Sequence, residues 1–339
     1  MPPAAAATAK RRALRAAGLV LSVVVLVLIC VASIAVGAKS VPVSEVWDGL
    51  FHNTGTGNDV IIRDVRVPRT LLGLVVGAAL GLSGAVMQAL TRNPLAEPGL
   101  LGVNAGAAAA VVSAISFLGV TSLTGYIWFA FAGAAAVSAA VYVLGGSRSA
   151  TPVRLALAGT AATAALYGYI NAVQLLDSAA LERLRFWTVG SLASADMDTT
   201  VKILPFVGTG LLLALLLARP LNAMEMGDDT ARALGAHLNR TRALSMLAVT
   251  LLCGAATAAC GPIIFVGLMI PHVVRAITGP DMRWILPYSA VLAPVLLLGA
   301  DVIGRVITRP SELQVGIVTA LVGGPVFIHL VRRKRMAQL

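Results

Sequence analysis

The chain of 339 residues is 58% hydrophobic and only 12% charged, and its mean hydropathy is +0.87. A soluble domain carries about 25% charged residues, so this composition excludes a soluble enzyme and a disordered chain. The apolar runs are long and continuous, whereas the strands of an outer-membrane barrel alternate in hydropathy. Much of the apolar content is glycine and alanine, the small residues with which helices pack together in lipid. Composition therefore predicts an all-α polytopic membrane protein.

The net charge is +11, with 26 basic and 15 acidic residues. In a soluble protein this excess would suggest nucleic acid as a partner, but in a membrane protein basic residues retain loops in the cytoplasm. The three cysteines lie in apolar runs without CxxC or Cys/His spacing, so we expect inert thiols. The four histidines are scattered along the chain and form no HExxH motif. We therefore predict no nucleic-acid partner and no metal site.

Eight blocks of the sequence contain no Asp, Glu, Lys or Arg and can hold a membrane-spanning helix of about 20 residues. They are 16–38, 70–91, 98–147, 155–176, 203–218, 243–274, 284–300 and 313–331. The third block has 50 residues, about 75 Å as a helix, so it must cross twice with a break within 119–125. The sixth block is interrupted at Gly261-Pro262 and fits either one long helix or two short ones.

The distribution of basic residues decides how many times the two large blocks cross the membrane. If both large blocks cross twice, ten spans with both termini inside place 17 of the 26 basic residues on the inner side. If neither crosses twice, only 14 lie inside. The positive-inside rule therefore predicts ten spans with both termini cytoplasmic. The expected organisation is a basic N-terminus at 1–15, a ten-helix membrane domain at 16–331 and a basic tail at 332–339.

The first apolar run follows Lys10-Arg11-Arg12 and ends near small residues, a combination that resembles a signal peptide. The run is about 20 residues long, which exceeds the apolar core of about 7–15 residues in a typical signal peptide. We therefore interpret it as an uncleaved first helix. In the second run, Gly73, Gly77 and Gly81 recur at every fourth residue, with Gly84 close behind. This ridge predicts close packing between helices of the chain; a role in lining a pathway is the alternative.

Some chemistries are missing from the sequence. None of the four lysines follows a glycine as a GxxxxGK[ST] motif requires, so the chain is not expected to hydrolyse ATP through a P-loop. The predicted spans hold no Asp, Glu, Lys or Arg in their interiors, which weakens an ion-coupled secondary transporter. That class stays open, because backbone carbonyls at broken helices can hold sodium. An intramembrane enzyme lacks any acid pair or nucleophile–base constellation.

The segment 66–107, RVPRTLLGLVVGAALGLSGAVMQALTRNPLAEPGLLGVNAGA, resembles the iron-siderophore and cobalamin (FecCD-type) permease family. Further stretches agree along nearly the whole chain: GAKSVP at 37–42, TPVRLALAG at 151–159, LRFWTVGSL at 184–192, GPIIFVGLMIPHVVR at 261–275, ADVIGRVI at 300–307 and LVGGPVFIHLVRRK at 321–334. The phrases TRNPLAEPGLLGVNAGA and LRFWTVGSL are most similar to permeases of ferric-enterobactin importers within this family. This narrower resemblance favours a catecholate ligand.

The resemblance implies ten helices per subunit, two permease subunits, two cytoplasmic ATPase subunits that hold ATP and Mg, and an extracytoplasmic binding protein. It further implies that Arg66, Arg69 and Arg305 face acidic residues of the binding protein, with Arg63 and Arg309 as additional candidates. Rim charges of this kind would orient a partner; the alternative is that they extend to lipid headgroups.

The inner loop 219–242 resembles the coupling helices that rest on the ATPase. Asp228 or Asp229 can cap a short helix and Gly235 can end it in a left-handed conformation, and the coupling candidates are Asp228, Asp229, Ala231, Leu234 and Gly235. The turn 147–154 resembles the cytoplasmic gate, with Thr151, Pro152 and Val153 at its centre. Phe186 and Trp187 either meet the arriving ligand or belong to the interfacial aromatic belt.

These observations predict the permease subunit of an ATP-driven importer of a ferric siderophore in the cytoplasmic membrane of a prokaryote. The chain itself is expected to be no enzyme and to carry no cofactor. A paralogue is favoured over an identical copy as the second permease. The same machinery with cobalamin or haem as cargo is the near alternative, and the ion-coupled secondary transporter is the alternative from another class.

Overall fold

The structure is a computed structural model that describes residues 3–37, 39, 46–47, 57–120, 122–146 and 151–336. Within these residues every regular element is a helix. The longer ones are α1 (Pro3–Ala35), α4 (Val67–Thr91), α5 (Val103–Leu118), α6 (Leu123–Leu144), α7 (Pro152–Leu176), α8 (Ser178–Trp187), α9 (Met197–Leu216), α12 (Leu238–Cys260), α13 (Val266–Thr278), α14 (Met282–Ile307) and α15 (Val315–Met336). The short ones are α3 (Gly57–Val60), η1 (Ile61–Arg66), η2 (Pro98–Leu101), α10 (Ala218–Glu225) and α11 (Asp228–Ala233).

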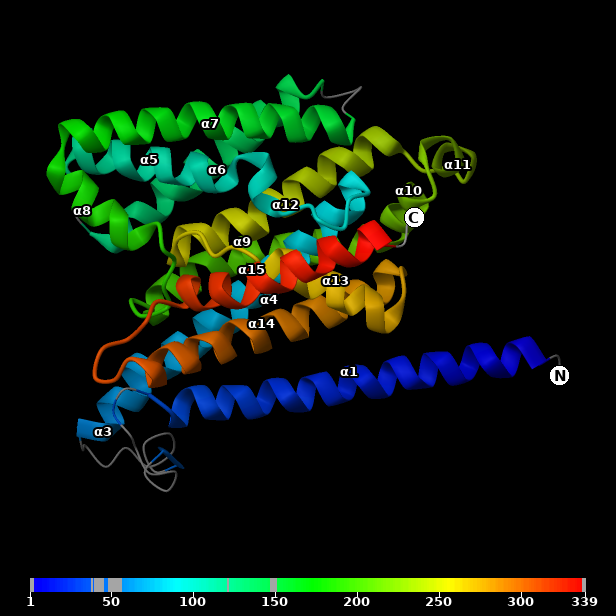
Figure 1. Cartoon of the computed structure of the whole chain (residues 1–339), viewed down its shortest axis with the longest axis horizontal. Helices are drawn as coiled ribbons and strands as arrows, with labels where there is room; N and C mark the ends of the chain where they lie inside the picture. Colours follow the sequence, from blue (N-terminus) through cyan, green and yellow to red (C-terminus); the bar gives the residue numbers. More distant parts are fainter. Residues whose placement is uncertain are drawn as a thin grey trace.

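The long helices lie side by side as a bundle (Figure 1). The start of α1, the end of α15 and the short helices α10 and α11 lie at one end of it, and α3, α8 and the α14–α15 connection lie at the other. Among the described residues, seven helical segments are long and apolar enough to cross a membrane, and the apolar helices at 103–118, 266–278 and 315–329 are shorter. The described part of the chain therefore forms the all-helical polytopic bundle that the sequence predicts.

Helix α4 is the centre of the bundle and contacts α1, α9, α12, α13 and α14. Its glycines allow the other backbones to approach: a Cβ on Gly77 would collide with the backbone of Pro294, one on Gly81 with the carbonyl of Ser289, and one on Gly84 with the carbonyl of Gly267. The predicted packing role of this ridge is confirmed. Neighbouring helices of the same chain bury 78% of the most apolar window of the α4 span.

Both oversized apolar blocks are divided. In the first, α5 ends at Leu118 and α6 begins at Leu123, and Gly119 between them has φ +65°. In the second, α12 ends at Cys260, and α13 begins only at Val266 after a segment in which Gly261 has φ +74°. Left-handed backbone of this kind favours glycine. The predicted break within 119–125 is confirmed, and the second block forms two helices rather than one.

One expectation about the spans is wrong. Helix α14 continues to Ile307 instead of ending near Ala300, so Asp301 and Arg305 lie inside a candidate membrane span. Both side chains are almost completely buried within the chain. Burial of a charge is tolerated where an opposite charge and hydrogen bonds compensate for lost hydration. Asp301 and Arg305 pair with each other, and further partners come from α4 and α1.

Candidate functional site

Arg69 of α4 and Asp301 of α14 form the centre of a buried ion-pair network. The Arg69 guanidinium donates from Nε and Nη2 to the Asp301 carboxylate, with a shortest N–O distance of 2.7 Å, and from Nη1 to Glu312 at 2.6 Å. Asp301 also pairs with Arg305 at 2.8 Å, one helical turn further along α14. Glu312, whose side chain is 32% exposed, is the member of the network closest to solvent.

The other two predicted arginines close the end of α1. The last carbonyls of a helix lack partners within it, and cations are favourable at that end of its dipole. Arg66 donates to the carbonyls of Ile34 and Ala35, both at 2.8 Å, while Arg305 donates to the carbonyl of Ser33 at 2.9 Å and to that of Val36 at 3.1 Å.

The structure thus brings Arg66, Arg69 and Arg305 together but buries them, at 4%, 5% and 2% exposure. Their docking role stays a prediction. A binding protein would have to compete for these arginines with the groups inside the chain that already bind them. Asp301 and Glu312 were missed because they lie 232 and 243 residues from Arg69. The only local signal for either was the i,i+4 spacing of Asp301 and Arg305, which suits an ion pair on one helix face.

At the opposite end of the bundle, the predicted coupling loop contains the short helix α11. Gly235, with φ +80°, follows this helix and confirms the left-handed ending. The amide of Gly235 donates to the carbonyl of Arg232 at 2.9 Å and that of Ala236 to the carbonyl of Ala231 at 2.9 Å, which closes the last turn. Ala231 is buried, whereas Leu234 is 63% exposed.

The predicted aspartate cap of α11 is wrong. The residue before the helix is Gly227, with φ +104°, and no side chain caps the first turn. The carboxylate of Asp228 is occupied elsewhere: one oxygen accepts from Arg242 of α12 at 2.7 Å and the other from Arg92. Asp229 pairs with Arg232 within α11 at 2.8 Å. Two arginines from distant segments therefore outcompete the backbone amides for Asp228.

Arg92 adds a further constraint to this bridge. It ends α4 in a left-handed conformation, with φ 50° and ψ 31°, which is uncommon for a residue other than glycine. The turn 92–97 follows directly and leads into η2. Asp228 thus fastens α11 both to the turn after α4 and to the first turn of α12. We call the three residues Arg92, Asp228 and Arg242 the α11 clip.

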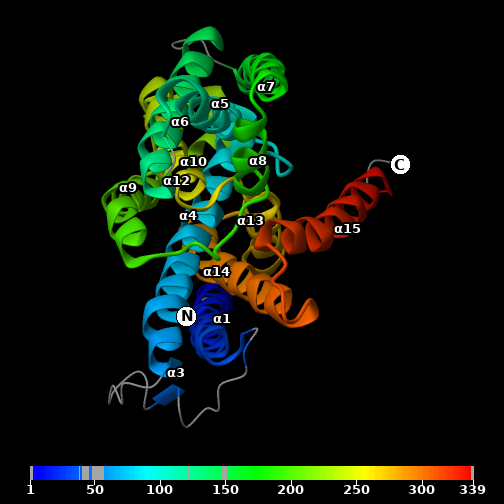
Figure 2. The same ribbon diagram turned by 90° about the vertical axis from the view of Figure 1, so that its left-hand side faces the viewer.

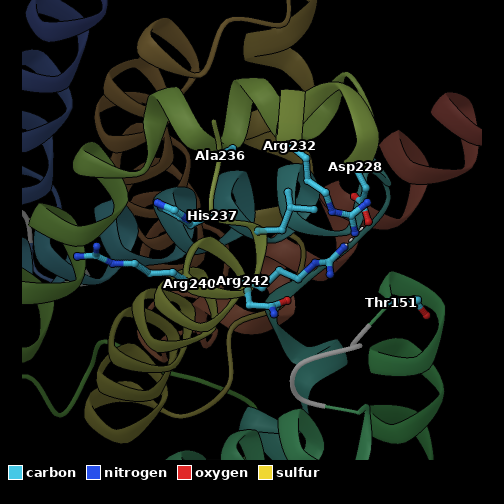
Figure 3. A pocket seen from close by; sticks show the side chains of 9 residues that line it. Thr151, Asp228, Arg232, Ala236, His237, Arg240 and Arg242 are labelled. Atoms are coloured by element: carbon cyan, nitrogen blue, oxygen red, sulfur yellow. Dashed lines mark hydrogen bonds and ion pairs between the residues drawn. The ribbon is translucent and has the colours of Figure 1, made fainter. Parts of the chain in front are cut away.

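The clip borders a cleft of about 890 Å³ that also reaches the predicted gate. Its lining includes Thr151, Asp228, Arg232, His237 and Arg242, and Figure 3 shows Thr151 across the cleft from the cluster of Asp228, Arg232 and Arg242. The cleft therefore unites a predicted gate residue with predicted coupling residues.

The gate residues themselves begin α7. Thr151 caps this helix by accepting from the amide of Arg154 at 3.3 Å, and Pro152 occupies its first position, where proline is favoured. Val153 is exposed. The part of the predicted turn at 147–150 lies outside the described residues.

Phe186 and Trp187 end α8 and are placed differently. Phe186 is exposed, with the Arg185 guanidinium 5.0 Å from its ring centroid. Trp187 is buried, and its carbonyl lies so close to Gly261 that a Cβ there would collide with it. Both side chains line a cavity of about 260 Å³ that includes Gln314 at the start of α15. Contact of either residue with a ligand stays a prediction.

Glu97 is a further polar residue that the sequence reasoning passed over. Its carboxylate accepts from the amide of Phe265 at 3.1 Å, at the start of α13. Burial raises the pKa of Glu97, and the Phe265 amide opposes that rise. The contact links the turn after α4 to the interrupted segment between α12 and α13. Among the described residues no three His, Cys, Asp or Glu side chains gather as metal ligands.

Comparison with known proteins extends these observations to the whole chain. A sequence model of the FecCD transport family matches residues 25–333. The chain is 46% identical over 326 residues to the ferric enterobactin transport system permease protein FepD of Escherichia coli, covering 95% of this chain and 96% of that protein. It is 38% identical over 312 residues to the probable siderophore transport system permease protein YfiZ of Bacillus subtilis, with 91% and 93% covered.

A solved structure agrees with the fold. A metal-chelate type ABC transporter in an inward-facing conformation superposes with a TM-score of 0.81 at 28% sequence identity, over 93% of this chain and 98% of that one. Permeases named for hemin and cobalamin import are also among the relatives. The helical bundle, its candidate membrane spans and a family match over nine-tenths of the sequence lead to one conclusion: the chain belongs to the FecCD transport family.

Proposed function

We propose that this chain is the membrane permease subunit of an ATP-driven importer that carries a ferric siderophore, preferably a catecholate, across the cytoplasmic membrane. The observation that carries the proposal is the 46% identity to the ferric enterobactin permease along nearly the full length of both proteins. ATP and Mg would be held by partner ATPase subunits. Cobalamin or haem carried by the same machinery is the second candidate, supported by the permeases of those systems among the relatives.

The proposed topology has ten membrane segments with both termini in the cytoplasm. The three shorter apolar helices would join the seven long ones. At 1.5 Å per residue, α13 alone is about 20 Å long, and the non-helical segment 261–265 before it would complete its crossing. Such irregular backbone is tolerated at membrane depth where protein buries it, and Gly261 and Ile263 are buried.

For coupling, we propose that α11 docks on the ATPase through Leu234 and its neighbours. Leu234 and Gly235 line a mostly apolar cavity of about 620 Å³ together with Leu216 and Pro220. An exposed apolar residue directly after a short helix and beside such a cavity suits a protein partner better than water. The α11 clip supports the mechanism, because a push on α11 would reach the turn after α4 and the start of α12 through Asp228.

We propose that the second permease subunit, for which a paralogue is favoured, packs against the face formed by α7, α8 and α15. These helices lie along one side of the molecule (Figure 2). Leu175 and Leu176 are 87% and 90% exposed there, and Leu321 is exposed on α15. A cavity of about 550 Å³ between these helices contains Tyr167, Pro262, Ile264 and Leu321. Thr151, Pro152 and Val153 would gate the cytoplasmic end of a pathway formed by the two permeases.

We propose that the binding protein docks at the end of the bundle that carries α8 and the network of Arg66, Arg69 and Arg305. Acidic side chains of that partner would have to exchange with Glu312 and Asp301. Glu312 is the exposed member, so exchange would begin there. Phe186 at the same end would meet the delivered ligand.

Transport by the reconstituted complex tests the proposal. The chain, its paralogue, the ATPase and the binding protein would be placed in liposomes, and uptake of iron-loaded catecholate, iron-loaded hydroxamate, haem and cobalamin would be compared with and without ATP. We expect ATP-dependent uptake of the catecholate complex. Uptake that persists without the ATPase subunit would instead support an ion-coupled carrier, and uptake of only haem or cobalamin would change the cargo.

A further inference from the structure

A basic groove of about 570 Å³ lies between residues 11–19 of α1 and the start of α14, and it shares no lining residue with the arginine network or the α11 clip. Three arginines of α1, Arg11, Arg12 and Arg15, line it together with Asp281, Arg283 and Trp284. Figure 1 shows α1 running alongside α14 and beginning at the end that the proposed topology assigns to the cytoplasm.

The groove has fixed walls. The hydroxyl of Tyr288 on α14 donates to the carbonyl of Arg15 at 2.6 Å, and Gly18 lies so close to the same hydroxyl that a Cβ there would collide with it. This contact holds α1 against α14 beside the groove. The arginine side chains therefore project from a braced helix, and the cost of ordering them for a ligand is reduced.

The charges of the groove do not cancel. Burial alone would raise the pKa of Asp281, but hydrogen bonds from Arg283 and Asn222 lower it to about 2. Asp281 is therefore ionised, and it neutralises Arg283, with N–O distances of 2.9–3.1 Å. Within the part of the chain that the structure describes, none of the three α1 arginines has an acidic partner. The groove thus presents three uncompensated guanidinium groups.

The lower edge of the groove is apolar. Leu19 of α1 and Pro287 of α14 line it. Trp284 also lines the groove, and tryptophan is enriched at the interface between membrane and water. A cationic rim above an apolar floor matches a molecule with a phosphate at one end and acyl chains at the other.

We propose that this groove binds the phosphate headgroup of an anionic phospholipid. Guanidinium groups bind phosphate through paired hydrogen bonds, and basic pockets between membrane helices on the cytoplasmic side bind such headgroups. A free phosphate ion would use the arginines but not the apolar floor, which is why the geometry favours the lipid. The inference depends on the proposed orientation of the chain and is independent of the cargo.

Native mass spectrometry of the purified, delipidated complex tests the proposal. Phosphatidylglycerol would be titrated in, with phosphatidylcholine as the neutral lipid and inorganic phosphate as competitor. Arg12→Gln with Arg15→Gln should weaken the first phosphatidylglycerol bound per permease by roughly tenfold or more, since each basic residue at a membrane surface contributes several-fold. The matched control, Arg332→Gln with Arg333→Gln, removes two charges from the same proposed face and should leave that affinity unchanged.

Equal loss in both variants, or equally tight binding of phosphatidylcholine, would overturn the proposal, and full displacement by millimolar phosphate would identify a site for free anions. The arginine pair also supports membrane orientation, so the double variant can fail to insert. A photoactivatable phosphatidylglycerol on the unmutated complex covers that case. We expect crosslinks at 11–19 and 281–287, and labelling spread along α7 or α9 instead would contradict the site.

Discussion

At the scale of single residues, the burial of Arg66 and Arg305 changes how docking can be tested. Both side chains hold the carboxyl-terminal carbonyls of α1, so reversing their charge would leave buried acids against carbonyl oxygens and disturb the fold itself. Breaking a buried charge pair by removing one partner costs about 3–5 kcal/mol. The exposed Glu312 is the residue at which docking and folding can be separated.

We therefore predict that Glu312→Gln strengthens association with the binding protein. The substitution removes one of the two carboxylates that hold Arg69 and leaves the Asp301 pair intact, so more of the Arg69 charge is available to an acidic partner. Glu312 is the solvent-facing member of its pair with Arg69, and ion pairs at the surface are worth about 0.2–1 kcal/mol. The expected gain is therefore up to about fivefold, measured by surface binding at several salt concentrations. Glu182→Gln on α8, at the same end, is the control; weaker association in Glu312→Gln would reject the docking role of Arg69.

The sequence predicted local features and missed long-range ones, for a physical reason. The break at Gly119 and the ending of α11 at Gly235 depend on the conformational freedom of single residues, which short patterns reveal. The partners of Arg69 and Asp228 depend on which helices pack together, and Arg92 lies 136 residues from Asp228. Asp228 followed the local rule for a helix cap, yet the tertiary fold offered it two guanidinium groups instead.

At the scale of elements, the α11 clip predicts a specific defect. Arg92→Gln and Asp228→Asn should each leave ATPase assembly and ATP hydrolysis largely intact but lower the siderophore uptake per ATP several-fold, because α11 then moves without the turn after α4. The double variant should be no worse than Asp228→Asn alone, since residues in one network are not additive. Uptake and phosphate release would be measured in the same proteoliposomes.

The comparison variant for this experiment is Arg275→Gln. Arg275 of α13 pairs with Glu225 of α10 at 2.8 Å, so the substitution breaks an interhelical ion pair at the same end without touching α11. We expect normal uptake per ATP in that variant. If Arg275→Gln uncouples as strongly as Arg92→Gln, loss of general stability is the cause and the clip has no special role.

Asp281 gives a pH-dependent prediction for the start of α14. Its pKa lies below the unfolded value, so its contribution to stability is present above about pH 4 and is lost as pH falls toward 2. Asp281→Asn should therefore lower the thermal unfolding midpoint by the same amount at every pH from about 5 to about 8. A difference that shrinks within that range would show that Asp281 titrates there and does not hold Arg283 as described.

At the scale of the whole molecule, the proposed ten-segment topology predicts opposite accessibility of two loops. In a chain whose three native cysteines are replaced, a cysteine at Ser194 should react with an impermeant thiol reagent added to intact cells. A cysteine at Ala236, beside α11, should react only after the membrane is opened. Labelling of Ala236 in intact cells would place the proposed coupling surface on the wrong side and reject the assignment.

The central position of α4 also has a consequence for how the protein is made. Ribosomes add about 5–20 residues per second, and roughly 190 residues separate the end of α4 from the start of α14. For about 10–40 s, then, the nascent chain holds Arg69 in a membrane helix whose counterion has not yet been synthesised. Until α14 is made, Gly77 and Gly81 of the α4 ridge likewise lack the backbone that packs against them. We therefore expect α4 to stay at the insertion machinery until the last sixth of the chain, from residue 282, has been synthesised.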